Sequence, residues 1–109
     1  MKPEEFSAIK LYGDKRVFLK MQAEGFRDVV FGKGPWVDDQ RVVGGFYFFG
    51  PEGQVAGYET LKSRGSRGIS RSKPTETHYS TDEFESRKSD LRLDLSDRKE
   101  LSDLLSNWG

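Results

Sequence analysis

The sequence predicts an α+β fold: a small antiparallel β-sheet of about five strands, arranged as a meander, with an amphipathic helix at the C-terminal end. Two observations lead to this prediction. Between residues 16 and 61, short β-branched and aromatic runs are separated by turns rich in Gly and Pro. Residues 101–108 instead carry apolar side chains at helical spacing. At 109 residues, the chain fits one domain, residues 1–109.

The first elements are read from local periodicity. Pro3, two glutamates, Phe6 and Ile9 fit a short N-terminal helix, since proline and acids favour the first helical turn. The same stretch also fits a strand, and we favour the helix. Val17, Leu19 and Met21 recur at every second position, which predicts a strand. Residues 26–31 are a second β-branched and aromatic run.

The central hairpin has the strongest signal in the chain. Residues 41–49 are apolar on both alternating faces, as expected for a strand covered on each side. Gly50-Pro-Glu-Gly53 supplies a turn, because Pro fixes φ and Gly accepts a positive φ. Residues 54–61 then return as the partner strand. The pattern predicts a hairpin over 41–61.

The C-terminal third predicts two strands and two helix starts. Polar β-formers at every second position from Thr75 to Thr81 suggest an edge strand, and Leu91, Leu93 and Leu95 suggest a half-buried one. Ser80 with Glu83, and Asp97 with Glu100, have capping-box spacing. The second box is expected to open a helix through Asn107 with one apolar stripe, formed by Leu101, Leu104, Leu105 and Trp108.

Composition limits the function classes. The chain has no cysteine, which excludes disulfides and thiolate metal sites and fits a reducing cytoplasm. No apolar run is long enough to span a membrane, and the N-terminus lacks the apolar stretch of a signal peptide. We therefore expect a cytoplasmic protein with no membrane partner. No pattern indicates a cofactor or a metal site.

Residues 62–73 form a cation-rich arm. They hold five positive charges, no negative charge and one apolar residue, in a chain of zero net charge. With Pro74 they make a flexible basic loop, residues 62–74, between ordered segments. Arginines flanked by Gly and Ser suit phosphate, because the backbone can approach it and donate N–H bonds. The expected contacts are Lys62, Arg64, Arg67, Arg71 and Lys73, with Trp36 of a Gly/Pro turn as a possible anchor.

The charge around the arm leaves its partner open. Residues 1–61 are close to neutral, with eight Lys/Arg against nine Asp/Glu, whereas residues 74–109 carry five against nine. An acidic C-terminal segment can pair with the arm and lowers the expectation of unspecific polyanion binding. Phe46, Tyr47, Phe48 and Phe49 either fill both faces of the sheet or leave one face for bases to stack on, and we favour core packing.

His78 is the only histidine and therefore the only candidate for histidine-based acid–base chemistry. Residues 64–69, followed by Thr75, Tyr79 and Asp82, resemble the C-terminal half of the small guanyl-specific ribonucleases of bacteria and fungi. In that family an Asp-His-Tyr segment supplies the acid histidine and an earlier glutamate the base. Here Glu83 stands at the histidine position and no Asn-Arg-Glu segment precedes it, so the resemblance implies no catalytic residues.

Together these patterns predict a non-enzymatic binding protein that uses the arm. The partner is nucleic acid or an acidic protein surface. Two alternatives remain: an inhibitor or adaptor of a larger enzyme, of the kind found among phage and bacterial accessory proteins, and a small ribonuclease-like enzyme that uses His78. The oligomeric state does not follow from the sequence.

Overall fold

A computed structural model describes residues 15–34, 40–63, 75–91, 93–95 and 98–106. The N-terminal helix expected from Pro3 onwards lies outside these ranges. In chain order the elements are α2 (Lys15–Ala23), β1 (Asp28–Lys33), β2 (Gln40–Phe49), β3 (Val55–Ser63), β4 (Thr75–Tyr79), α3 (Thr81–Leu91), β5 (Asp94–Leu95), β6 (Lys99–Glu100) and α4 (Leu101–Ser106). The fold is α+β, as predicted.

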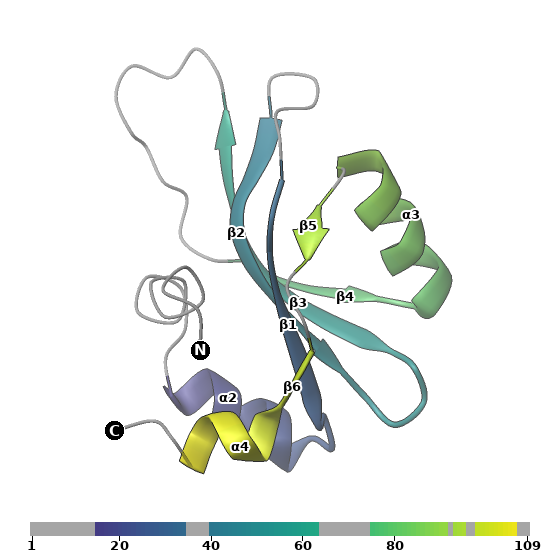
Figure 1. Cartoon of the computed structure of the whole chain (residues 1–109). Helices are drawn as coiled ribbons and strands as arrows, with labels where there is room; N and C mark the ends of the chain where they lie inside the picture. Colours follow the sequence, from purple (N-terminus) through teal and green to yellow (C-terminus); the bar gives the residue numbers. More distant parts are fainter. Residues whose placement is uncertain (1–14, 35–39, 64–74, 92, 96–97, 107–109) are drawn as a thin grey trace.

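The strands form one antiparallel sheet in the order β4-β3-β2-β1-β5, with β6 also paired to β1 (Figure 1). Successive strands β1 to β4 are neighbours, which confirms the predicted meander. β5 pairs with one end of β1 and β6 with the other. These two-residue strands together make one interrupted edge, while β4 makes the opposite edge.

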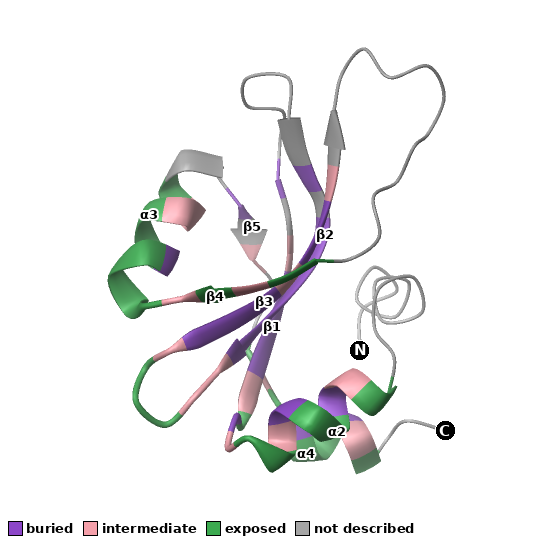
Figure 2. Cartoon of the chain, turned by 180° about the vertical axis from the view of Figure 1, so that it is seen from behind, coloured by how far each residue is buried: buried purple, intermediate pink, exposed green. Residues whose placement is uncertain are grey.

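The helices cover both faces of the sheet (Figures 1 and 2). On one face, Phe18 and Met21 of α2 and Leu101 of α4 pack against Phe46 and Phe48. On the other face, Phe84 of α3 packs against Tyr47 at a ring-centroid distance of 5.1 Å. The aromatic run of β2 therefore fills the core on both sides, which confirms the favoured prediction of core packing over an open stacking platform.

The strand predicted around Val17–Met21 is instead the helix α2. Phe18 and Met21 are three residues apart and fully buried, while Leu19 is 47% exposed. The helix ends in a Schellman motif: Gly25 has φ of 97°, and the N–H of Phe26 donates to the carbonyl of Met21 at 3.0 Å. Helical packing against the sheet overrode the two-residue alternation, which the segment also satisfies.

The hairpin and the first capping box are confirmed. β2 and β3 pair from Gln40↔Ser63 to Phe49↔Val55, and Gly53 in the connecting turn has φ of 82°. At the start of α3, the N–H of Glu83 donates to Oγ of Ser80 at 3.2 Å. In return, the N–H of Ser80 donates to Oε2 of Glu83 at 3.3 Å. Helix α3 thus begins where that box predicts.

Three C-terminal boundaries differ from the prediction. Thr81 and Leu91 belong to α3 rather than to strands, so only Asp94–Leu95 remains of the expected leucine strand. The last helix begins at Leu101, because Lys99 and Glu100 form β6 and Glu100 pairs with Asp28 in the sheet. Its predicted stripe is partly confirmed, with Leu101 and Leu104 buried. Asp97, Asn107 and Trp108 lie outside the described residues.

Candidate functional site

Most residues predicted to bind a partner lie outside the described residues: Trp36, Arg64, Arg67, Arg71 and Lys73. Lys62 belongs to β3, one residue before the strand ends at Ser63. The structure therefore describes where the arm leaves the sheet and where the chain returns to it, at Thr75.

The arm begins at a projecting end of the β2–β3 hairpin (Figure 1). β4 pairs with β3 only as far as Glu59, opposite Thr75, whereas β2 and β3 continue to Gln40↔Ser63. At this end the register sets Arg41 opposite Lys62. We call this end of the sheet, marked by Arg41 and Lys62, together with the arm that follows Lys62 in the sequence, the cationic end of the sheet.

The cationic end contrasts with its neighbour on β1. There Lys33 is paired with Asp94 of β5, so opposite charges occupy directly opposed positions. Arg41 and Lys62 are instead like-charged at opposed positions. Opposed like charges disfavour strand pairing, while opposed unlike charges favour it. The register therefore sets two residues of like charge opposite each other where the arm begins.

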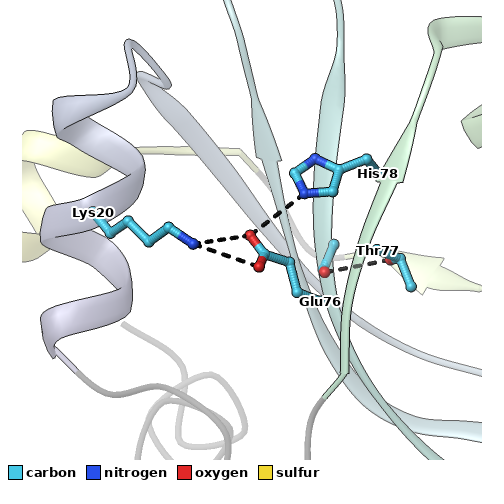
Figure 3. Close-up of polar contacts among 5 residues, drawn as sticks. Lys20, Glu76, Thr77 and His78 are labelled. Carbon is cyan, nitrogen blue, oxygen red and sulfur yellow. Dashed lines mark hydrogen bonds and ion pairs between the residues drawn. The ribbon is translucent and has the colours of Figure 1, made fainter.

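A second polar group lies on the surface between α2 and β4 (Figure 3). Nζ of Lys20 donates to both carboxylate oxygens of Glu76, at 3.3 and 3.4 Å. Nε2 of His78, two residues along the same strand, is 3.5 Å from Oε1 of Glu76. His78 is exposed, as the sequence predicts. The carboxylate nearest to it comes from its own strand and is already bound to the lysine.

These contacts keep Glu76 ionised. Partial burial raises the pKa of Glu76, but hydrogen bonds from Lys20 and Tyr58 outweigh that effect and the net pKa is lowered. The hydrogen bond to Glu76 in turn raises the pKa of Lys20. A carboxylate with a lowered pKa is a weaker base, and a phosphodiester could enter between Glu76 and His78 only by breaking their contact. We therefore interpret Lys20, Glu76 and His78 as an ion-pair cluster that links α2 to β4, rather than as the nuclease site considered for His78.

A third polar group is buried under α3. Glu59 is only 2% exposed, and its carboxylate accepts hydrogen bonds from the hydroxyls of Tyr47 and Tyr79, each at 2.7 Å. Arg87 of α3 approaches the same carboxylate at 3.5 Å. Burial and the neighbouring Glu59 charge raise the pKa of Tyr47, so this hydroxyl remains a donor. Glu59 is thus a buried charge with donors from three elements, which joins α3 to the sheet.

Small residues make room for this buried group. The ring of Tyr47 crosses the backbone at Gly45 and Gly57. An added Cβ at Gly45 would lie 3.1 Å from the Tyr47 hydroxyl, and one at Gly57 would lie 3.3 Å from the Tyr47 ring and 2.8 Å from Oγ1 of Thr77. Gly57 is directly opposite Tyr47 in the β2–β3 register. A side chain at either position would push the phenol away from Glu59. These glycines therefore position the donor, and sequence reasoning about turns did not single them out.

Comparisons with protein-family models, curated proteins and solved structures found no match for this chain. Within the described residues, no three or more His, Cys, Asp or Glu side chains gather as a metal site would require. None of the described helices is long and apolar enough to cross a membrane. Asp82 and Glu83 lie in the first turn of α3, where the capping-box spacing of Ser80 and Glu83 predicts a helix start.

Proposed function

We propose that the protein binds the phosphate backbone of nucleic acid through the cationic end of its sheet. The observation that supports this most directly is the register of Arg41 opposite Lys62, where the arm begins. Like charges at directly opposed positions disfavour strand pairing, and a polyanion placed against them would offset that repulsion. The arm adds four more cations beyond Lys62 with no acid among them.

The composition of the arm favours nucleic acid over an acidic protein. Segments rich in Arg, Gly and Ser are typical of proteins that follow a nucleic-acid backbone without reading sequence. The aromatic run of β2 does not add base stacking to this mode, since Phe46, Tyr47 and Phe48 are all under 2% exposed. Binding would then depend on phosphate contacts and be strongly salt-dependent.

The test is a binding titration with single- and double-stranded DNA and RNA over a range of salt concentrations. Replacing Arg64, Arg67 and Arg71 together by Ala should weaken binding to every sequence alike. It should also reduce the slope of log K against log salt by about 2–3, since each lost phosphate contact removes about 0.7–0.9. Arg41→Ala should act in the same direction. Lys33→Ala is the matched control, because Lys33 already faces Asp94.

A substitution of Trp36 tests a different kind of contact. If its ring anchors the complex, Trp36→Ala should lower affinity without changing the salt slope, since the ring carries no charge. If no complex forms at low salt with single- or double-stranded DNA or RNA, the proposal is wrong. Capture of a specific acidic protein after nuclease treatment, lost in the triple arginine variant, would then favour the inhibitor or adaptor alternative.

A further inference from the structure

Among the described residues, β4 lies at one edge of the sheet, where it pairs only with β3, through all five of its residues and in unbroken register. An edge strand presents unpaired N–H and C=O groups on alternate residues, which can accept another strand. The other edge differs, because it consists of two separate strands, β5 and β6, of only two residues each. Very short edge strands resist such pairing, so β4 is the edge able to extend the sheet.

The sequence of β4 lacks several of the features that block an edge, although it carries one acidic residue, Glu76. Thr75-Glu-Thr-His-Tyr79 contains no Pro and no Lys, and its pairing with β3 has no bulge. Proteins commonly use such residues or bulges to prevent edge pairing. Threonine and tyrosine are also strong strand formers. The strand is therefore suited to accept a partner strand.

The carboxylate and imidazole side chains of β4 are arranged symmetrically about its centre. Glu76 and His78 flank Thr77, and both lie on the face of the sheet that carries α2, where Glu76 meets Lys20. If two copies of β4 pair antiparallel about Thr77, Glu76 of each copy is opposite His78 of the other. Thr77 is then opposite Thr77, and Thr75 opposite Tyr79. A two-fold interface requires such a self-complementary pattern.

We propose that the protein forms a symmetric homodimer in which two β4 strands pair antiparallel about Thr77 and extend the sheet across both copies. The outward side of His78 is available for this, since 68% of its side chain is exposed. Glu76 keeps its contact with Lys20, and its remaining exposed surface faces the histidine of the other copy. Because the contact is one five-residue strand, the interface is small and the affinity is that of a weak, concentration-dependent dimer. This inference does not depend on the proposed function.

Sedimentation velocity over a concentration series up to ~1 mM tests the dimer. The wild-type protein should shift from monomer to dimer as concentration rises. Glu76→Lys and His78→Glu should each raise the dissociation constant about tenfold, because every dimer contains the pair twice. The double variant, Glu76→Lys with His78→Glu, should recover most of the loss. Glu52→Lys in the exposed β2–β3 turn is the matched charge control.

A cysteine cross-link tests the register, since the chain has no cysteine of its own. Directly opposed residues have Cα atoms about 4.5–5.5 Å apart, within reach of a disulfide, so Thr77→Cys should form a disulfide-linked dimer on oxidation. Thr75→Cys is the control in the same strand. In the proposed register, Thr75 of one copy lies four residues along the strand from Thr75 of the other. The two Cα atoms are then about 13 Å apart, too far for a disulfide.

The outcomes separate clearly. A wild-type protein that remains a monomer at every concentration overturns the dimer. A dimer in which the double charge variant does not recover, or in which Thr75→Cys links and Thr77→Cys does not, overturns this pairing about Thr77. Circular dichroism of each variant confirms that it is folded before its association is measured.

Discussion

The hydroxyl of Tyr47 donates a 2.7 Å hydrogen bond to Oε2 of Glu59, a carboxylate that is only 2% exposed. The two residues belong to neighbouring strands, with Tyr47 opposite Gly57 and therefore displaced by two residues from Glu59. Tyr79 binds the other carboxylate oxygen from β4. A charge this deeply buried is tolerated only when its lone pairs are satisfied, so each of these donors is expected to matter for stability.

Tyr47→Phe should destabilise the protein by about 1–3 kcal/mol, because it leaves one oxygen of the buried Glu59 carboxylate without its donor. Chemical denaturation monitored by circular dichroism gives the difference. Tyr58→Phe is the matched comparison, since the Tyr58 hydroxyl bonds to the carboxylate of Glu76, whose side chain is 33% exposed, so that water can replace the lost donor. Its effect should fall within about 0.5 kcal/mol. Equal losses in the two variants would contradict the special role of the buried bond.

Stability should fall in alkaline solution, in part through the same tyrosine. Burial, followed by the Glu59 charge, raises the pKa of Tyr47 above its ordinary value of 10. Above that value the unfolded chain releases the phenol proton while the folded chain retains it, so rising pH favours unfolding. Tyr47→Phe should therefore show a shallower loss of stability than wild type between pH ~9 and ~11. Identical slopes in denaturation curves would count against this.

Helix α3 should depend on its capping box. Ser80→Ala removes the side-chain acceptor of the Glu83 N–H, which is bonded at 3.2 Å. The expected cost is ~1 kcal/mol, the usual value for an N-cap serine. Ser86→Ala, at an exposed position within the same helix, should cost much less and is the control. Thermal unfolding of the two variants makes the comparison, and a more damaging Ser86→Ala would show that the box is not what holds the helix start.

The sequence was sufficient for elements whose signals are local. The hairpin follows from a Pro-Gly turn between two apolar runs, and α3 from the spacing of Ser80 and Glu83. It was insufficient where one segment fits two spacings. Val17, Leu19 and Met21 have the two-residue spacing of a strand, whereas Phe18 and Met21 have the three-residue spacing of a helix. Packing against the aromatic residues Phe46 and Phe48 of the sheet decides for the helix.

The polar clusters could not be predicted, because their members meet through tertiary pairing. Glu59 in the middle of a strand was a local signal of something unusual, since unpaired carboxylates are rarely buried. Its partners, however, lie 12, 20 and 28 residues away. Lys20 and Glu76 are 56 residues apart and meet only because α2 lies beside the β4 edge. The register of Arg41 with Lys62 likewise requires the exact pairing, including the shift between Val42 and Gly44.

The contact between Lys20 and Glu76 should be visible in the titration of the carboxyl. Partial burial raises the pKa of Glu76, and hydrogen bonds from Lys20 and Tyr58 lower it by more, so that it lies below its ordinary value of 4.5. Lys20→Met removes the ammonium while keeping an unbranched side chain, and the Glu76 pKa should rise. Carboxyl chemical shifts followed by NMR over an acid titration measure this directly.

The same lowered pKa has a consequence for acid stability. The contribution of Glu76 is fully present above its unfolded pKa and is lost as the pH falls through the lower folded value. Wild type should therefore lose more stability than Lys20→Met on acidification below the ordinary glutamate pKa. Lys88→Met is the matched control, because Lys88 pairs with Glu85 within α3 and does not contact Glu76. If Glu76 titrates identically in wild type and Lys20→Met, the tie between α2 and β4 does not persist in solution.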